Sequence, residues 1–98
     1  MKISRFEDLE VWRTARAIAN STYKLTHNNT FSQDFALKDQ LSGSAISIIA
    51  NIAEGFERNS NKDFIRFLRY SISSAAESKS HLYLAMDLSY ISQDQLDE

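Results

Sequence analysis

The sequence contains no cysteine, no proline and only two glycines among its 98 residues. The absence of cysteine excludes disulfide bonds and any thiolate that could act as a metal ligand or nucleophile. The absence of proline removes the residue that most strongly interrupts a helix, and no segment shows the polar and apolar alternation of a strand bounded by turns. We therefore predict an all-α protein that folds as one domain over residues 1–98.

An excess of basic charge and a long apolar run are also missing. The net charge is −2 and the isoelectric point is about 5.6, unlike the strongly basic balance of proteins that coat nucleic acid. No apolar run approaches the roughly 20 residues of a membrane-spanning helix, and acidic residues follow Met1 too early for a secretory signal peptide. We expect a cytoplasmic protein with no membrane partner.

The spacing of apolar residues predicts three long amphipathic helices. We expect them over residues 6–27, 33–56 and 61–88. The first starts at Phe6 or Leu9, and residues 27–32 form a polar loop in which Ser32 caps the second helix. A break is expected over residues 89–91. The core stripe predicted for the third helix consists of Phe64, Leu68, Ile72, Ala75, Leu82 and Met86.

Residues 51–60 predict a tight turn between the second and third helices, which makes these helices antiparallel neighbours. Gly55 is expected to close the second helix in the left-handed conformation. Ser60 is a favourable N-cap, and Asp63 lies in the first turn, where the helix dipole favours a carboxylate. The residues assigned to the turn are Asn51, Glu54, Gly55 and Ser60.

The pattern after residue 91 predicts the start of a fourth helix. Ser92 and Gln95 form a capping box, but the helix has at most seven residues within the 98 of the sequence, and an isolated helix of that length is unstable in water. Three alternatives stay open: three helices suffice, a partner covers the remaining groove, or the sequence is part of a longer chain. We expect an antiparallel up-down four-helix bundle with a short or truncated fourth helix.

Residues on faces away from the predicted core indicate self-association. The predicted oligomer interface consists of Ala36, Gly43, Ala50, Tyr70, Leu84 and Leu88. The first three repeat every seven residues, and small side chains let the backbone of another helix approach closely. The last three make the third helix apolar on a second side. In the alternative interpretation the small residues simply face solvent, and Gly43 weakens its helix by about 1 kcal/mol relative to alanine.

No catalytic or metal-binding pattern is evident in the sequence. The Glu-x-x-His spacing of di-iron bundles and the glycine-rich phosphate loop are both missing. We expect Glu54 or Glu77 to pair with an arginine, and the serines of the third helix to serve close helix packing. An enzyme or metal protein built on Glu54, Glu77 and His81 is the least favoured hypothesis, because His27 and His81 have no ligand partners in sequence. We predict no enzymatic activity, no metal and no cofactor.

One basic cluster occurs in the chain, and it consists of Arg58, Lys62, Arg66 and Arg69. Spacings of four and three residues from Lys62 onward place its last three members on one helical face. Such a face could contact phosphates. The alternative is a solvated face whose charges pair with Glu57 and Asp63. Repeated around a symmetric oligomer, the cluster would form a substantial patch.

Several segments together resemble a known family. They are residues 6–12, 40–41, 47–55, 60, 63–64, 67–68 and 77. With Asn-Ile-Ala-Glu-Gly at residues 51–55, this pattern resembles the 23S rRNA-intervening-sequence proteins over residues 6–91. The resemblance implies a small bacterial cytoplasmic four-helix bundle that assembles as a homopentamer and has no established enzymatic activity. Some such proteins are encoded within 23S rRNA genes, and a related branch binds nucleic acid and a reverse transcriptase.

The chain departs from this family pattern in two places. Ser42 and Gly43 stand where the family usually has two arginines, which removes basic charge from the second helix. Only seven residues follow Ile91, where the family usually continues as a full fourth helix. We predict a non-enzymatic homo-oligomeric scaffold that contacts RNA or DNA through the basic cluster. The alternative is a protein-binding module that accepts a partner helix and has no nucleic-acid role.

Overall fold

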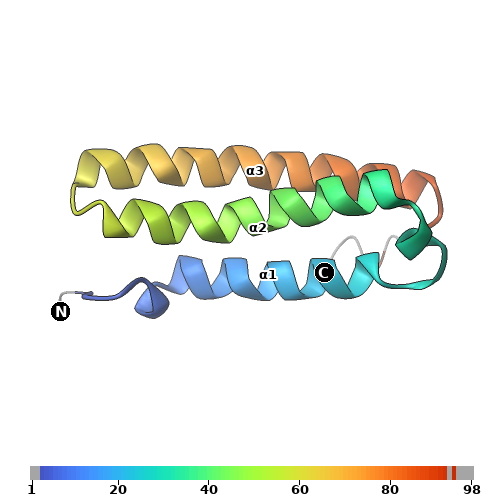
Figure 1. The fold of residues 1–98 in the computed structure, drawn as a ribbon, viewed down its shortest axis with the longest axis horizontal. Helices are drawn as coiled ribbons and strands as arrows, with labels where there is room; N and C mark the ends of the chain where they lie inside the picture. The colour runs from blue at the N-terminus through green and yellow to red at the C-terminus, as the bar shows by residue number, and fades with distance from the viewer. Residues whose placement is uncertain (1–2, 93, 95–98) are drawn as a thin grey trace.

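The computed structural model describes residues 3–92 and residue 94, and it is helical throughout. The short 3-10 helix η1 (Phe6–Asp8) precedes α1 (Glu10–Thr26), and η2 (Asn29–Gln33) leads to α2 (Phe35–Glu57) and α3 (Asn61–Asp87). The long helices pack antiparallel, with α2 between the other two (Figure 1). The all-α prediction is confirmed, and the part of the chain that the structure describes contains no strand and no fourth long helix. Gln95 of the predicted capping box lies outside the described residues.

Side-chain capping defines where α2 and α3 begin. Asp34 caps α2 by accepting a hydrogen bond from the Leu37 backbone N–H at 3.1 Å, so the prediction that Ser32 caps this helix is wrong. Ser60 caps α3 as predicted, because its hydroxyl accepts a hydrogen bond from the Asp63 N–H at 3.1 Å. The predicted break after α3 is also confirmed, with Ser89 in the left-handed region at a φ of 65°.

Gly55 has a different role from the one predicted. Asn59, not Gly55, takes the left-handed conformation of the turn, with a φ of 64°, and Gly55 stays within α2. A Cβ atom at position 55 would lie 2.6 Å from the Cβ of Phe67 on α3. Glycine is therefore required at this position because α2 and α3 approach closely here. It is not required for its backbone conformation, since its φ is not positive.

Serine side chains continue this close contact between α2 and α3. The Ser44 hydroxyl donates to the Leu41 carbonyl at 3.0 Å and lies 2.7 Å from the Ser78 hydroxyl, and both serines are buried. The Ser71 hydroxyl donates to the Ile48 carbonyl of α2 at 2.9 Å. The prediction of serine-mediated packing is confirmed for these residues of α3. We call the contact formed by Ser44, Gly55, Phe67, Ser71 and Ser78 the α2–α3 seam.

The predicted core stripe of α3 is rotated from the one observed. The buried residues of α3 are Phe67, Ser71, Ser78 and Ala85. Ile72 and Ala75 of the predicted stripe are exposed, Ile72 by 68%, and the other four residues are half-buried. The prediction based on hydrophobicity is wrong because small side chains occupy most of the positions of α3 that lie closest to α2. Most of the larger apolar side chains of α3 therefore lie on either side of this contact.

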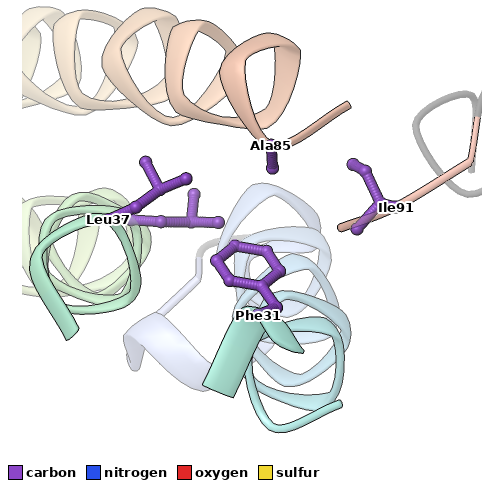
Figure 2. Packing of buried hydrophobic residues seen from close by; sticks show 5 residues of the cluster. Phe31, Leu37, Ala85 and Ile91 are labelled. Atoms are coloured by element: carbon purple, nitrogen blue, oxygen red, sulfur yellow. The ribbon is translucent and has the colours of Figure 1, made fainter. Parts of the chain in front are cut away.

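Two clusters of apolar side chains form the core. The cluster in Figure 2, here called the distal cluster, consists of Phe31, Leu37, Leu41, Ala85 and Ile91. The second cluster consists of Ala15, Ile48 and Ile52, with Leu9, Trp12, Ile49 and Leu68 packed against it.

Phe31 lies at the centre of the distal cluster, although the sequence predicts a polar loop there. Its side chain is completely buried, because the 3-10 turn of η2 directs it between α2 and the segment after α3 (Figure 2). Its ring stacks on Tyr90 with the centroids 5.1 Å apart, and the Tyr90 hydroxyl donates to Asp34 at 2.9 Å. The predicted loop is therefore an ordered part of the core.

Candidate functional site

The basic cluster lies where α2 ends and α3 begins. Arg58 is the C-cap residue of α2, and the other three members lie on the first turns of α3. All four side chains are exposed. The structure therefore brings together the residues that the sequence grouped, although they belong to two helices.

Two members of the cluster are held in place by neighbouring side chains. Arg58 pairs with Glu54 at 2.9 Å, and Arg66 pairs with Asp63 at 3.1 Å. Their guanidinium groups lie 4.9 and 5.0 Å from the ring centroid of Phe67, within the range of a cation–π contact. The expected pairing of Glu54 with an arginine is confirmed. Because the two ion pairs are exposed, they contribute little to stability, and both arginines can exchange a carboxylate for a phosphate.

Lys62 and Arg69 differ from these two arginines. Within residues 3–92, neither has an acidic partner within 4.0 Å. Together with Ile65, Arg66 and Tyr70 they line a shallow hollow of about 470 Å³ on the exposed side of α3. Hydrogen bonding to Tyr70, and then to Asp63, raises the pKa of Arg66 above its usual value, so this guanidinium stays charged. The hollow thus combines three cations with an aromatic and an aliphatic side chain.

Ile65 and Tyr70 are the members of this hollow that the sequence did not assign to it. Tyr70 was placed in the predicted oligomer interface, and Ile65 had no role. The available signal was the spacing of three, four, seven and eight residues from Lys62, which puts both on the helical face of the cations.

A second candidate surface is an apolar groove between α1 and α3. It has a volume of about 310 Å³ and is lined by Val11, Thr14, Ala15, Ile18, Ile48, Ile52, Leu68, Ser71, Ile72 and Ala75. The contributions of α1 and α3 recur at the three- and four-residue spacing of a helix face, and Val11, Ile18 and Ile72 are exposed. Side chains at this spacing form ridges and grooves into which the side chains of another helix can pack.

The residues predicted for an oligomer interface are exposed on α2 and α3. Ala36, Gly43 and Ala50 lie on the solvent side of α2, and a Cβ at Gly43 would meet no atom within 4 Å. Tyr70 and Leu84 are exposed on α3, and Leu88 is exposed as the C-cap residue of this helix. Their exposure fits the predicted positions outside the core, and the interface itself stays a prediction.

The remaining candidates for chemistry are Glu77 and the two histidines. Glu77 lies 3.6 Å from His81 Nε2, and that nitrogen is buried without a hydrogen bond to any described residue. His27 Nδ1 lies 2.6 Å from the carbonyl of Tyr23 on its own helix. In the described part of the chain, no group of three His, Cys, Asp or Glu residues could hold a metal ion. No helix among these residues is both long and apolar enough to cross a membrane.

The family model described as 23S rRNA-intervening sequence protein matches residues 7–98. No curated protein matches the chain significantly.

Proposed function

Because the chain belongs to the 23S rRNA-intervening sequence protein family, we propose that it is a non-enzymatic homo-oligomeric protein that binds nucleic acid through the basic cluster. The observation that carries this proposal is the convergence of Lys62, Arg66 and Arg69 on one exposed hollow. Two of these cations have no acidic partner among the described residues, so they can bind phosphates without first losing an ion pair.

The net charge of the chain makes a local cluster necessary. A protein with a charge of −2 does not attract a polyanion as a whole, so binding depends on a concentrated patch of positive charge. With Ser42 and Gly43 on α2, that patch lies on α3. A cyclic oligomer repeats the cluster once per subunit, and a pentamer would present five copies to one nucleic-acid chain.

Binding measured over a range of salt concentrations tests the nucleic-acid role. We expect labelled RNA or DNA to bind at low salt, with the logarithm of affinity falling linearly with the logarithm of salt concentration. Replacing Lys62 and Arg69 by glutamine should weaken binding and flatten this slope. The control changes Arg13 and Lys24, two exposed cations of α1, to glutamine and keeps the same net charge. Undetectable binding at low salt, or an equal loss in the control, would contradict the proposal.

Light scattering tests the oligomer. We expect a mass several times the 11.2 kDa of one chain, and dissociation when Leu84 and Leu88 are changed to glutamate, since charges placed in an apolar interface must be desolvated. Ala76→Glu, at an exposed position on another side of α3, serves as control. A monomer mass for the unaltered protein at micromolar concentration would rule the assembly out.

The apolar groove supports a second candidate function, a module that binds the apolar face of a helix from another protein. Under this proposal the protein captures a stoichiometric partner in a nuclease-insensitive manner, and Ile72→Asp abolishes the capture. Capture that requires nucleic acid, or that survives Ile72→Asp, would exclude it.

A further inference from the structure

We infer, on the basis of the proposed nucleic-acid binding, that the basic cluster takes single-stranded rather than duplex nucleic acid, with an unpaired base stacked on Tyr70. The hollow on α3 contains apolar side chains in addition to the cations that would bind phosphates. Beside the cations it presents the ring of Tyr70, which is 45% exposed, and the side chain of Ile65, which is also exposed. A site for phosphates alone has no use for these apolar surfaces.

The Tyr70 ring is held in position by its neighbours. It meets the Phe67 ring edge to face, with centroids 5.4 Å apart and an interplanar angle of 81°. Phe67 is itself buried and flanked by the guanidinium groups of Arg58 and Arg66. A ring fixed in this way loses little conformational freedom when a ligand stacks on it.

The three cations of the hollow precede Tyr70 along α3, and Arg69 is its neighbour in sequence. Lys62 and Arg69 are seven residues apart, which corresponds to about 10 Å along the helix axis. A strand that places a base on Tyr70 can therefore bring the phosphates on one side of that base first to Arg69 and then to Lys62. Aromatic platforms beside a cationic track are typical of proteins that bind single strands, because every unpaired base has a free π face. In a duplex those faces are covered by stacking.

Two other exposed aromatic rings differ from Tyr70. The ammonium group of Lys79 lies 6.0 Å from the Tyr83 ring centroid, and that of Lys38 lies 5.2 Å from the Phe35 centroid. Among the described residues, no cation lies over the ring of Tyr70. Tyr83 is 47% exposed, nearly the same as Tyr70, and so provides a matched control.

The assignment of Tyr70 to a ligand changes the predicted oligomer interface. A base cannot stack on a ring that another subunit covers. We therefore assign Tyr70 to the nucleic-acid site and leave Leu84 and Leu88 as the apolar interface residues of α3. Tyr70→Ala should accordingly leave the mass measured by light scattering unchanged.

The test compares a short single-stranded oligonucleotide with a duplex of the same length by fluorescence anisotropy. We expect Tyr70→Ala to weaken single-strand binding roughly 5- to 150-fold, while Tyr70→Phe keeps the affinity because the ring remains. Tyr83→Ala should have no effect. The salt dependence should stay the same in Tyr70→Ala, since no phosphate contact is lost, whereas it should flatten when Lys62 and Arg69 are replaced.

A second measurement is independent of the affinity of any variant. A single strand that carries 5-iodouracil is irradiated in complex with the unaltered protein, and the crosslinked residue is identified by mass spectrometry. We expect the crosslink at Tyr70. Equal or tighter duplex binding, no effect of Tyr70→Ala, or crosslinks only elsewhere would overturn the single-strand inference and leave the proposed function standing. If neither nucleic acid binds at low salt, the proposed function fails, and this inference fails with it.

Discussion

The side of α3 that faces α2 differs sharply from the side that faces α1. Toward α2, the seam is so close that position 55 has no space for a Cβ atom, and the distal cluster closes one end. Toward α1, the apolar groove leaves Val11, Ile18 and Ile72 exposed. The seam itself is built from three serines, one glycine and Phe67, and the groove side carries exposed large aliphatic residues.

This difference shows that apolar character alone does not identify a helix partner. Small residues let two backbones meet directly, and buried hydroxyls satisfy their hydrogen bonds across the contact. Large aliphatic side chains bury more area, but only where a neighbour lies against them. On α3 the exposed aliphatic residue Ile72 therefore marks a surface without a neighbour among the described residues, and the buried serines Ser71 and Ser78 mark the contact with α2.

The largest effect is expected from a comparison of Phe31 with Ile72. Phe31→Ala should lower the free energy of unfolding by about 3–5 kcal/mol, because the side chain is completely buried. Ile72→Ala should change it by no more than about 0.5 kcal/mol, since this side chain is 68% exposed. Urea denaturation at one protein concentration measures both. Equal losses would mean that the groove is covered in solution.

The two glycines give the next largest contrast. Gly55→Ala should destabilise the protein by about 1–3 kcal/mol through overpacking against Phe67. Gly43→Ala should stabilise it by up to about 1 kcal/mol, because this helical position is open and alanine is the better helix former. Thermal unfolding of both variants checks these signs. A fall in oligomer mass for Gly43→Ala would instead support the predicted interface at Gly43.

A double-mutant cycle on Ser44 and Ser78 measures the hydrogen bond within the seam. Each alanine variant should lose about 1 kcal/mol. Ser44→Ala should be the worse of the two, because it leaves the buried Ser78 hydroxyl without its partner, whereas Ser44 can still donate to Leu41. Ser73→Ala, at an exposed position of α3, is the control. Strictly additive losses would argue against a direct hydrogen bond between the two hydroxyls.

The smallest effect is a pH dependence at the closed end. The hydrogen bond to Asp34, together with burial, raises the pKa of Tyr90 above its usual value near 10. The folded state therefore favours the protonated tyrosine, and this contribution is fully present below pH 10 and is lost as the pH rises through the raised pKa. Tyr90→Phe should show a smaller loss of stability than the unaltered protein between pH 9 and 11, a window about one unit either side of the usual pKa. Identical pH profiles would contradict the role of this hydrogen bond.

Much of the architecture could be predicted from local chemistry. The approximate extents of the three helices and the cap at Ser60 depend on neighbours close in sequence, and the structure confirms them. The roles of Gly55 and Phe31 could not be predicted in this way, because each depends on residues distant in sequence. Gly55 is required by Phe67 on the next helix, and Phe31 is buried by Tyr90 and Ile91.

The sequence by itself determined that this protein is helical, where its long helices start and stop, and which family it belongs to, since periodicity, capping and motif are properties of short stretches of chain. Only the tertiary structure decided which side of α3 meets α2 and that Gly55 and Phe31 make contacts with residues distant in sequence. The physical reason is that the contact between two helices forms where their backbones can approach most closely. That position depends on the side chains of both helices, which lie far apart in the sequence.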